Sequence, residues 1–220
     1  WQAGVDKMKS LIQTNPAQAS EEVGELLKGK NKKNVDLVTS VAHVYLDAGK
    51  LTEAQEYLAM AKKADNKDPK VSVLEGDIAL AQKNIGQACQ LYEQAIYFDP
   101  NCKEAYLKYA QAYKSASPAL AIEKLEQLKA VDPNCLEADR ELAEVYYSSN
   151  RFGKAAEMYA KFIDTPLATE DDMLKYAFAL FLNHDFEKSL QVAQKGLQKN
   201  ARHAAFNRLV MYNNTDLKRY

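Results

Sequence analysis

Apolar residues recur along much of the chain at the spacing of one helical face, and a short polar turn separates paired segments of this kind. In residues 136–166, Leu142 and Tyr146 lie about one helical turn apart before such a turn, and Phe152 and Tyr159 lie about two turns apart after it. A lone helix cannot bury its single apolar face. The two segments are therefore expected to pair as an antiparallel hairpin that still leaves apolar surface for a neighbour to cover.

The same pair of segments recurs about every 34 residues. Small residues mark the places where paired helices approach most closely, because helix axes about 8–10 Å apart leave no room for large side chains there. They form two columns in step, in which one interval is 33 residues and the others are 34: Ala42, Gly76, Ala110, Ala143 and Ala177 in the first helices, and Ala54, Ala88, Ala121, Ala155 and Ser189 in the second.

This register predicts an all-α fold, an α-solenoid of antiparallel helix hairpins with about six and a half repeats in a single domain over residues 1–220. Residues 1–34 fit the repeat least well. In the partial last repeat, Tyr220 falls in the column of Phe152 and Phe186. The repeats run over about 1–34, 35–68, 69–102, 103–135, 136–169, 170–203 and, in part, 204–220.

Residues that favour helix ends fall near the expected boundaries. Gly49 follows the helix of the second repeat, where a left-handed C-cap is favoured. Thr52 with Gln55 predicts a capping box at the start of the next helix. Thr169 precedes three acidic residues, so it is expected to cap a helix whose positive end the acids stabilise.

The repeat resembles the tetratricopeptide repeat family. Its 34-residue pattern places a large residue, Leu-Gly, Tyr, Ala, an aromatic, Ala and Pro at set offsets. Residues 136–169 match it through Leu142, Ala143, Tyr146, Phe152, Ala155, Tyr159 and a displaced Pro166. The resemblance implies a right-handed superhelix whose concave groove is lined by the first helices of the repeats. It also implies a scaffold that binds protein or peptide in that groove.

The inward positions of the first helices give the expected partner-binding residues. In the C-terminal half they place aromatic side chains beside Arg and Lys, which is typical of interface hot spots. Phe178 and Phe181 have an alternative role as packing between helices, and both roles stay open. The partner-binding residues are Thr39, His43, Asp77, Lys108, Gln111, Arg140, Glu144, Tyr147, Lys175, Phe178, Phe181, Arg208 and Tyr212.

The composition argues against several classes of partner. Lys and Arg number 29 and Asp and Glu number 30, so the net charge of −1 predicts no bulk attraction to nucleic acid or to an anionic membrane. No apolar run approaches the roughly 18 residues that a membrane span needs, and no membrane insertion is expected.

No catalytic constellation is recognisable, and we predict a protein that is not an enzyme and uses no cofactor. His43, His184 and His203 lie far apart and share no metal-ligand spacing with a cysteine or carboxylate. Glycine-rich phosphate loops, nucleophile elbows and zincin helices are also missing from the sequence.

The ends of the sequence leave alternatives open. The chain begins at Trp1 rather than Met and stops within a repeat, so we expect a fragment of a larger repeat-containing protein. It is then either a binding scaffold, a structural segment that self-associates end to end, or the recognition arm of a larger enzyme or assembly. The cytoplasm and the bacterial periplasm both remain possible compartments.

Overall fold

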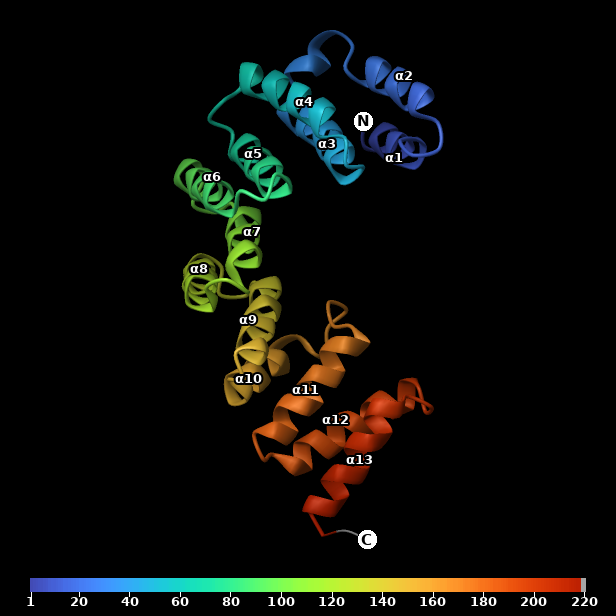
Figure 1. Cartoon of the computed structure of the whole chain (residues 1–220), viewed down its shortest axis with the longest axis vertical. Coiled ribbons are helices and arrows are strands. Elements are labelled where there is room, and N and C mark those ends of the chain that lie inside the picture. The colour runs from blue at the N-terminus through green and yellow to red at the C-terminus, as the bar shows by residue number, and fades with distance from the viewer. Residues whose placement is uncertain (219–220) are drawn as a thin grey trace. The chain divides into compact units, whose positions relative to one another are not determined.

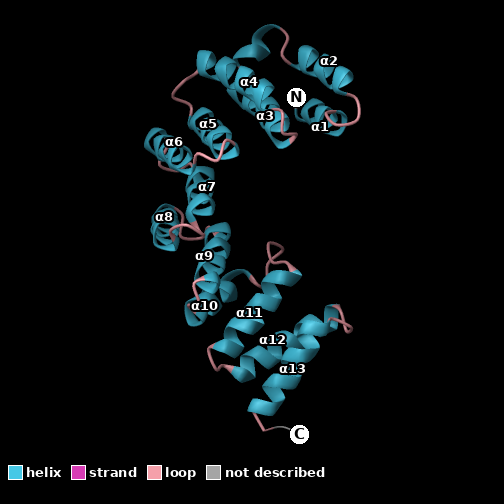
Figure 2. Cartoon of the chain, in the orientation of Figure 1, coloured by secondary structure: helices cyan, strands magenta, loops and turns pink. Residues whose placement is uncertain are grey.

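The structure is a computed structural model that describes residues 1–218, and Figures 1 and 2 show helices joined by turns. Within these residues there are thirteen α-helices, one 3₁₀ helix and no strand, which confirms the all-α prediction. Tyr220 lies outside the described residues. The elements are α1 (Gln2–Leu11), α2 (Pro16–Leu26), η1 (Gly29–Lys33), α3 (Val35–Asp47), α4 (Leu51–Ala64), α5 (Pro69–Ala81), α6 (Ile85–Phe98), α7 (Lys103–Tyr113), α8 (Pro118–Val131), α9 (Leu136–Ser148), α10 (Phe152–Phe162), α11 (Glu170–Leu182), α12 (Phe186–Lys199) and α13 (Ala204–Asp216).

The chain divides into two compact units, Trp1–Ala112 and Tyr113–Tyr220. The first contains the hairpins α1–α2, α3–α4 and α5–α6, followed by α7. The second contains α8, the hairpins α9–α10 and α11–α12, and α13. Hairpins stack within each unit, with α1 against α3, α3 against α5 and α11 against α13. This stacking is that of an α-solenoid, whereas the single domain over both units and the repeat boundaries stay predictions.

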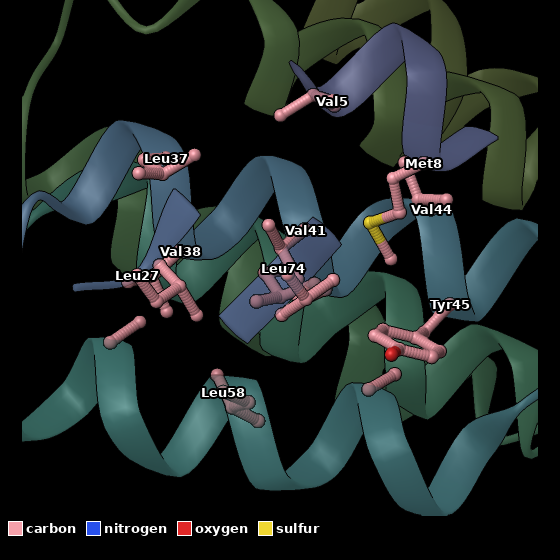
Figure 3. Packing of buried hydrophobic residues seen from close by; sticks show 14 of the residues in the cluster. Val5, Met8, Leu27, Leu37, Val38, Val41, Val44, Tyr45, Leu58 and Leu74 are labelled. Carbon is pink, nitrogen blue, oxygen red and sulfur yellow. The ribbon is translucent and has the colours of Figure 1, made fainter. Parts of the chain in front are cut away.

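The core of the first unit lies where its hairpins meet (Figure 3). Met8 from α1, Val41 and Tyr45 from α3, Leu58 from α4 and Leu74 from α5 all belong to one buried cluster. Because the cluster draws on three hairpins, no single hairpin encloses it. Each hairpin is therefore stabilised by apolar surface that its neighbours supply.

The small residues of the two columns are all buried. Gly76 on α5 shows why large side chains are excluded. A Cβ at this glycine would lie 2.5 Å from a ring carbon of Tyr92 on α6, and the Tyr92 side chain is itself completely buried. The aromatic ring thus occupies the space that a small residue leaves open between paired helices.

The helix ends agree with the expectations at two of three positions. Gly49 has a φ of +74°, in the left-handed region. Thr169 caps α11 through a capping box. The capping box expected at Thr52 is wrong, because α4 already begins at Leu51 with Lys50 as its N-cap, and no side chain caps it. Thr52 is consequently inside the first helical turn.

Two glycines in helices test the packing at Gly76. Replacing Gly24 by Ala meets no atom within 4 Å, so we expect a gain of about 0.5–1 kcal/mol in the free energy of unfolding from helix propensity. Gly76→Ala gains the same propensity but forces the Tyr92 ring to move, and a net loss of about 1–3 kcal/mol is expected. Urea unfolding of both variants measures the difference, and equal stabilisation by both would contradict the packing described here.

Candidate functional site

A buried carboxylate joins the first helices of the first unit. Asp77 on α5, only 8% exposed, accepts a hydrogen bond from Lys108 Nζ on α7 at 2.7 Å. His43 Nε2 on α3 lies 3.0 Å from the same oxygen. From α6, the Tyr92 hydroxyl donates to the other carboxylate oxygen at 2.7 Å. Three predicted partner-binding residues, one from each of three helices, are thus brought together around one charge.

The His43 ring faces an acceptor at each nitrogen. Nδ1 lies 3.0 Å from the Thr39 main-chain carbonyl oxygen, and Nε2 faces the Asp77 carboxylate. Both hydrogen bonds can form together only when both nitrogens carry a proton. The ring is therefore held between the Thr39 carbonyl group and the Asp77 carboxylate.

Ionisation of Asp77 is stabilised by these contacts. Burial of the carboxyl opposes ionisation, but hydrogen bonds from His43 and Lys108 outweigh burial, and the pKa of Asp77 is held below its ordinary value. Burial and the neighbouring Asp77 charge raise the pKa of the Tyr92 hydroxyl, which keeps it a donor. Both Asp77 oxygens accept hydrogen bonds, from Tyr92 and from Lys108, so the buried charge is not left unpaired.

The second unit contains an equivalent cluster. The Tyr159 hydroxyl on α10 donates to Glu144 Oε1 on α9 at 2.8 Å, and Lys175 Nζ on α11 lies 3.0 Å from both Glu144 carboxylate oxygens. Lys175 also pairs with Asp171 at 2.8 Å. We call Asp77–Tyr92–Lys108 and Glu144–Tyr159–Lys175 the two clasps.

The sequence analysis missed the tyrosines of both clasps, although their spacing gives a recognisable signal. In each clasp the tyrosine follows the acid by 15 residues and the lysine follows it by 31. The tyrosines share a column with Leu58 and Leu125, so that column by itself indicates only apolar packing. An acid 15 residues before the tyrosine and a lysine 16 residues after it distinguish the two repeats in which the tyrosine hydroxyl has a carboxylate partner.

A pocket of about 370 Å³ opens beside His43 in the first unit. Thr39 lines it but is only 4% exposed, and its hydroxyl donates to Val35 O in its own helix at 2.8 Å. Residues from α3, α5 and α7 contribute charged groups to the pocket lining, in which Lys70 forms an ion pair with Asp36. The lining consists of Trp1, Asp36, Thr39, Ser40, His43, Lys70, Val73 and Glu104.

Arg140 in the second unit is engaged within the protein. Its guanidinium contacts Asp172, with Nε 3.2 Å from Oδ1 and a terminal nitrogen 3.1 Å from Oδ2. Asp172 also belongs to the capping box of α11 and is 2% exposed. Arg140 thereby links α9 to the first turn of α11.

The predicted aromatic residues of the second unit are partly exposed and partly packed. Phe178 and Phe181 are partly buried and pack against the core cluster of α11, α12 and α13. The Phe181 ring lies 6.2 Å from that of Tyr212, which is 44% exposed. Tyr147 is half-buried and packs edge-on against Phe152, with centroids 5.7 Å apart.

The two remaining predicted residues, Gln111 on α7 and Arg208 on α13, are exposed. Over residues 1–218, no group of three His, Cys, Asp or Glu side chains has an arrangement that could hold a metal ion. In the same residues no helix combines the length and the apolar character of a membrane span.

Comparison with known proteins identifies the repeat. The family model for the tetratricopeptide repeat matches residues 39–101 and 111–168, which is more than half of the chain. A search of the curated proteins returns no match.

Solved structures with the same fold share little sequence with this chain. PilW, described as a widely conserved type IV pilus biogenesis factor, is 17% identical with a TM-score of 0.71, over 96% of this chain and 97% of PilW. PilF of Pseudomonas aeruginosa is 16% identical with a TM-score of 0.68, over 94% and 95% of the two chains. YrrB, described as a TPR protein with an unusual peptide-binding site, is 14% identical with a TM-score of 0.60, over 84% and 96%.

The depressed pKa of Asp77 predicts a loss of stability in acid. Because this carboxylate is easier to ionise in the folded than in the unfolded chain, it stabilises the fold above its unfolded pKa of about 4. That contribution disappears as the pH falls through the lower folded pKa. We expect the free energy of unfolding to fall less steeply below about pH 4 in Asp77→Asn than in the parent protein. Urea titrations at several pH values measure both slopes, and identical slopes would contradict the ionised clasp.

The hydroxyl of the second clasp can be tested with a matched pair of tyrosines. Tyr159 and Tyr176 have ring centroids 6.1 Å apart, but only Tyr159 donates to a carboxylate. Tyr159→Phe is expected to lower the free energy of unfolding by about 1.5 kcal/mol, because the hydrogen bond goes to a charged group. Tyr176→Phe is expected to change it by less than about 0.5 kcal/mol. Chemical unfolding compares the two, and equal losses would show that the Tyr159 hydroxyl has no special role.

Proposed function

Because this chain belongs to the tetratricopeptide repeat family, we propose that it binds a protein or peptide along the face formed by the first helices of its hairpins. Repeats of this family serve as interaction scaffolds, and we propose the same non-enzymatic role for this chain. The contact residues proposed are those predicted at the inward positions of the first helices. In the first unit this face includes the pocket beside His43, and in the second it includes Tyr147, Phe178 and Tyr212.

The observation that carries the proposal is the ordering of this face by the clasps. Lys108 and Lys175 are about 30% exposed, yet each is held by a carboxylate of the preceding hairpin. Side chains held in place before binding lose little conformational entropy when a partner arrives. Such a face is suited to recognition of a partner segment by a fixed row of polar and aromatic groups.

Partly exposed aromatic side chains supply the apolar contacts that such a partner needs. Tyr147, Phe178 and Phe181 each keep part of their surface open while their remaining atoms pack within the unit. Rigid aromatic groups of this kind are typical binding anchors. YrrB, which shares the fold, is described as having a peptide-binding site, and this supports a peptide as one class of partner.

The double variant Tyr147→Ala with Phe178→Ala tests the proposed face. We expect it to weaken binding to peptides selected on the parent protein by at least about tenfold, because it removes two aromatic anchors. Tyr97→Ala is the matched control, since Tyr97 is 82% exposed but lies on α6, a second helix. A peptide array followed by fluorescence anisotropy measures both effects.

Because Phe178 packs against the core cluster, thermal unfolding must first show that the double variant is folded. If it is not, Tyr147→Ala alone replaces it, and the expected loss is then smaller. Retention of every interaction by a folded variant would refute the proposed face.

A further inference from the structure

The segment that contains the last described helix, α13, carries more basic than acidic side chains, although α13 itself has one of each. Residues 199–218 carry four basic side chains and one acidic side chain, although the whole chain has a net charge of −1. Within the described residues, none of these five side chains takes part in an ion pair or a side-chain hydrogen bond. They are Lys199, Arg202, Arg208, Asp216 and Lys218.

Charges on the earlier first helices of the second unit are neutralised within the protein. Arg140 on α9 contacts Asp172, and Lys175 on α11 contacts Glu144 and Asp171. Arg208 occupies the next first helix, α13, at the repeat position equivalent to Arg140, but it is exposed and has no ion pair with any residue from 1 to 218. The guanidinium of Arg208 is therefore available to a partner, whereas that of Arg140 is already occupied.

An aromatic surface adjoins this cation. Tyr212 follows Arg208 by four residues on α13, so both lie on one face of the helix. The Tyr212 ring is 44% exposed and lies 6.2 Å from the Phe181 ring on α11. Phe181 in turn packs edge-on against Phe186, with centroids 5.4 Å apart. We call Arg208, Tyr212 and Phe181 the α13 face.

We propose that the α13 face binds an acidic peptide segment with an apolar anchor side chain. An Asp or Glu of the peptide pairs with the Arg208 guanidinium, which can donate two parallel hydrogen bonds to a carboxylate. The anchor side chain packs on the rings of Tyr212 and Phe181. This inference rests on the proposed function, because the α13 face belongs to the first-helix face, and it specifies the partner's chemistry.

Charge complementarity argues for an acidic occupant. Within residues 199–218, basic side chains outnumber acidic ones by three and none of them forms an ion pair with another described residue, so the segment around α13 favours an acidic partner. A nucleic acid is also acidic, but the net charge of the whole chain is −1, and such a charge gives no general attraction to a polyanion. We therefore favour a peptide, and the experiment includes an oligonucleotide.

The experiment selects peptides from a displayed library of random twelve-residue sequences on the parent protein and measures their affinity by fluorescence anisotropy. We expect the selected peptides to be enriched in Asp or Glu together with an aromatic or Leu residue. Arg208→Glu and Tyr212→Ala are each expected to weaken binding by at least about tenfold. Lys63→Glu, the same charge reversal at an exposed lysine on α4, is the control and is expected to leave affinity within about twofold.

Peptides with a reversed charge provide a second test of the pairing with Arg208. Peptides in which Lys replaces the acidic residue should bind Arg208→Glu more tightly than they bind the parent protein. Selected peptides that are neutral, or that bind Arg208→Glu as tightly as the parent, would overturn the inference. A twelve-nucleotide oligo(dT) that binds more tightly than every selected peptide, and does so through Arg208, would overturn it in favour of nucleic acid.

The two proposals fail in different ways. Peptides that lose affinity with Tyr147→Ala and Phe178→Ala but not with Arg208→Glu would overturn the acidic partner and leave the first-helix face intact. The absence of any selected peptide, or binding that none of these variants weakens, would overturn both.

Discussion

The close approach of paired helices within each hairpin is the constraint on which the rest of the structure depends. A Cβ at Gly76 would lie 2.5 Å from a ring carbon of Tyr92, so a side chain fits there only if the ring moves. The same ring directs its hydroxyl at Asp77, the next residue along α5. Packing between helices and hydrogen bonding to the first-helix face are therefore coupled through one side chain. The second unit repeats the relation, because buried Ala143 precedes Glu144, to which Tyr159 donates.

The cost of burying charged groups limits the net stability that the clasps add. Removing a carboxylate and an ammonium group from water costs free energy, and their attraction offsets much of that cost only when the geometry is good. Around Asp77 every polar partner is within 3.0 Å, so the buried charge is fully compensated. Shifting the helices relative to one another would leave that charge without donors. Each clasp thus selects one alignment of successive first helices, whereas the apolar cores supply the driving force for stacking.

Much of the fold follows from the sequence, because the information lies in periodicity. Two columns of small residues in step predict hairpins that stack, and both columns are buried. The clasps could not be predicted in the same way. Tyr92 and Leu58 occupy the same column and are both buried, so the column indicates apolar packing and not a hydrogen-bonded hydroxyl. The sequence also left open whether Phe178 packs between helices or stays exposed. In the structure its side chain is partly buried against the core cluster and partly exposed. A helix end depends on a few local residues, which specify it weakly. The N-cap predicted at Thr169 is therefore present, whereas the capping box predicted at Thr52 is not.

Pairing within the first-helix face limits what a partner can recognise there. Four residues at the predicted inward positions already contact an acidic side chain of the same unit: His43, Lys108, Arg140 and Lys175. A partner that competed for them would have to replace hydrogen bonds that the fold supplies, and it would leave a carboxylate such as that of Asp77 buried and unpaired. Under the proposed function, discrimination between partners would therefore depend mainly on groups that the fold does not neutralise. These groups are the partly exposed aromatic rings and Arg208 on α13, which forms no ion pair within residues 1–218, and they are the basis of the proposed acidic partner with an apolar anchor.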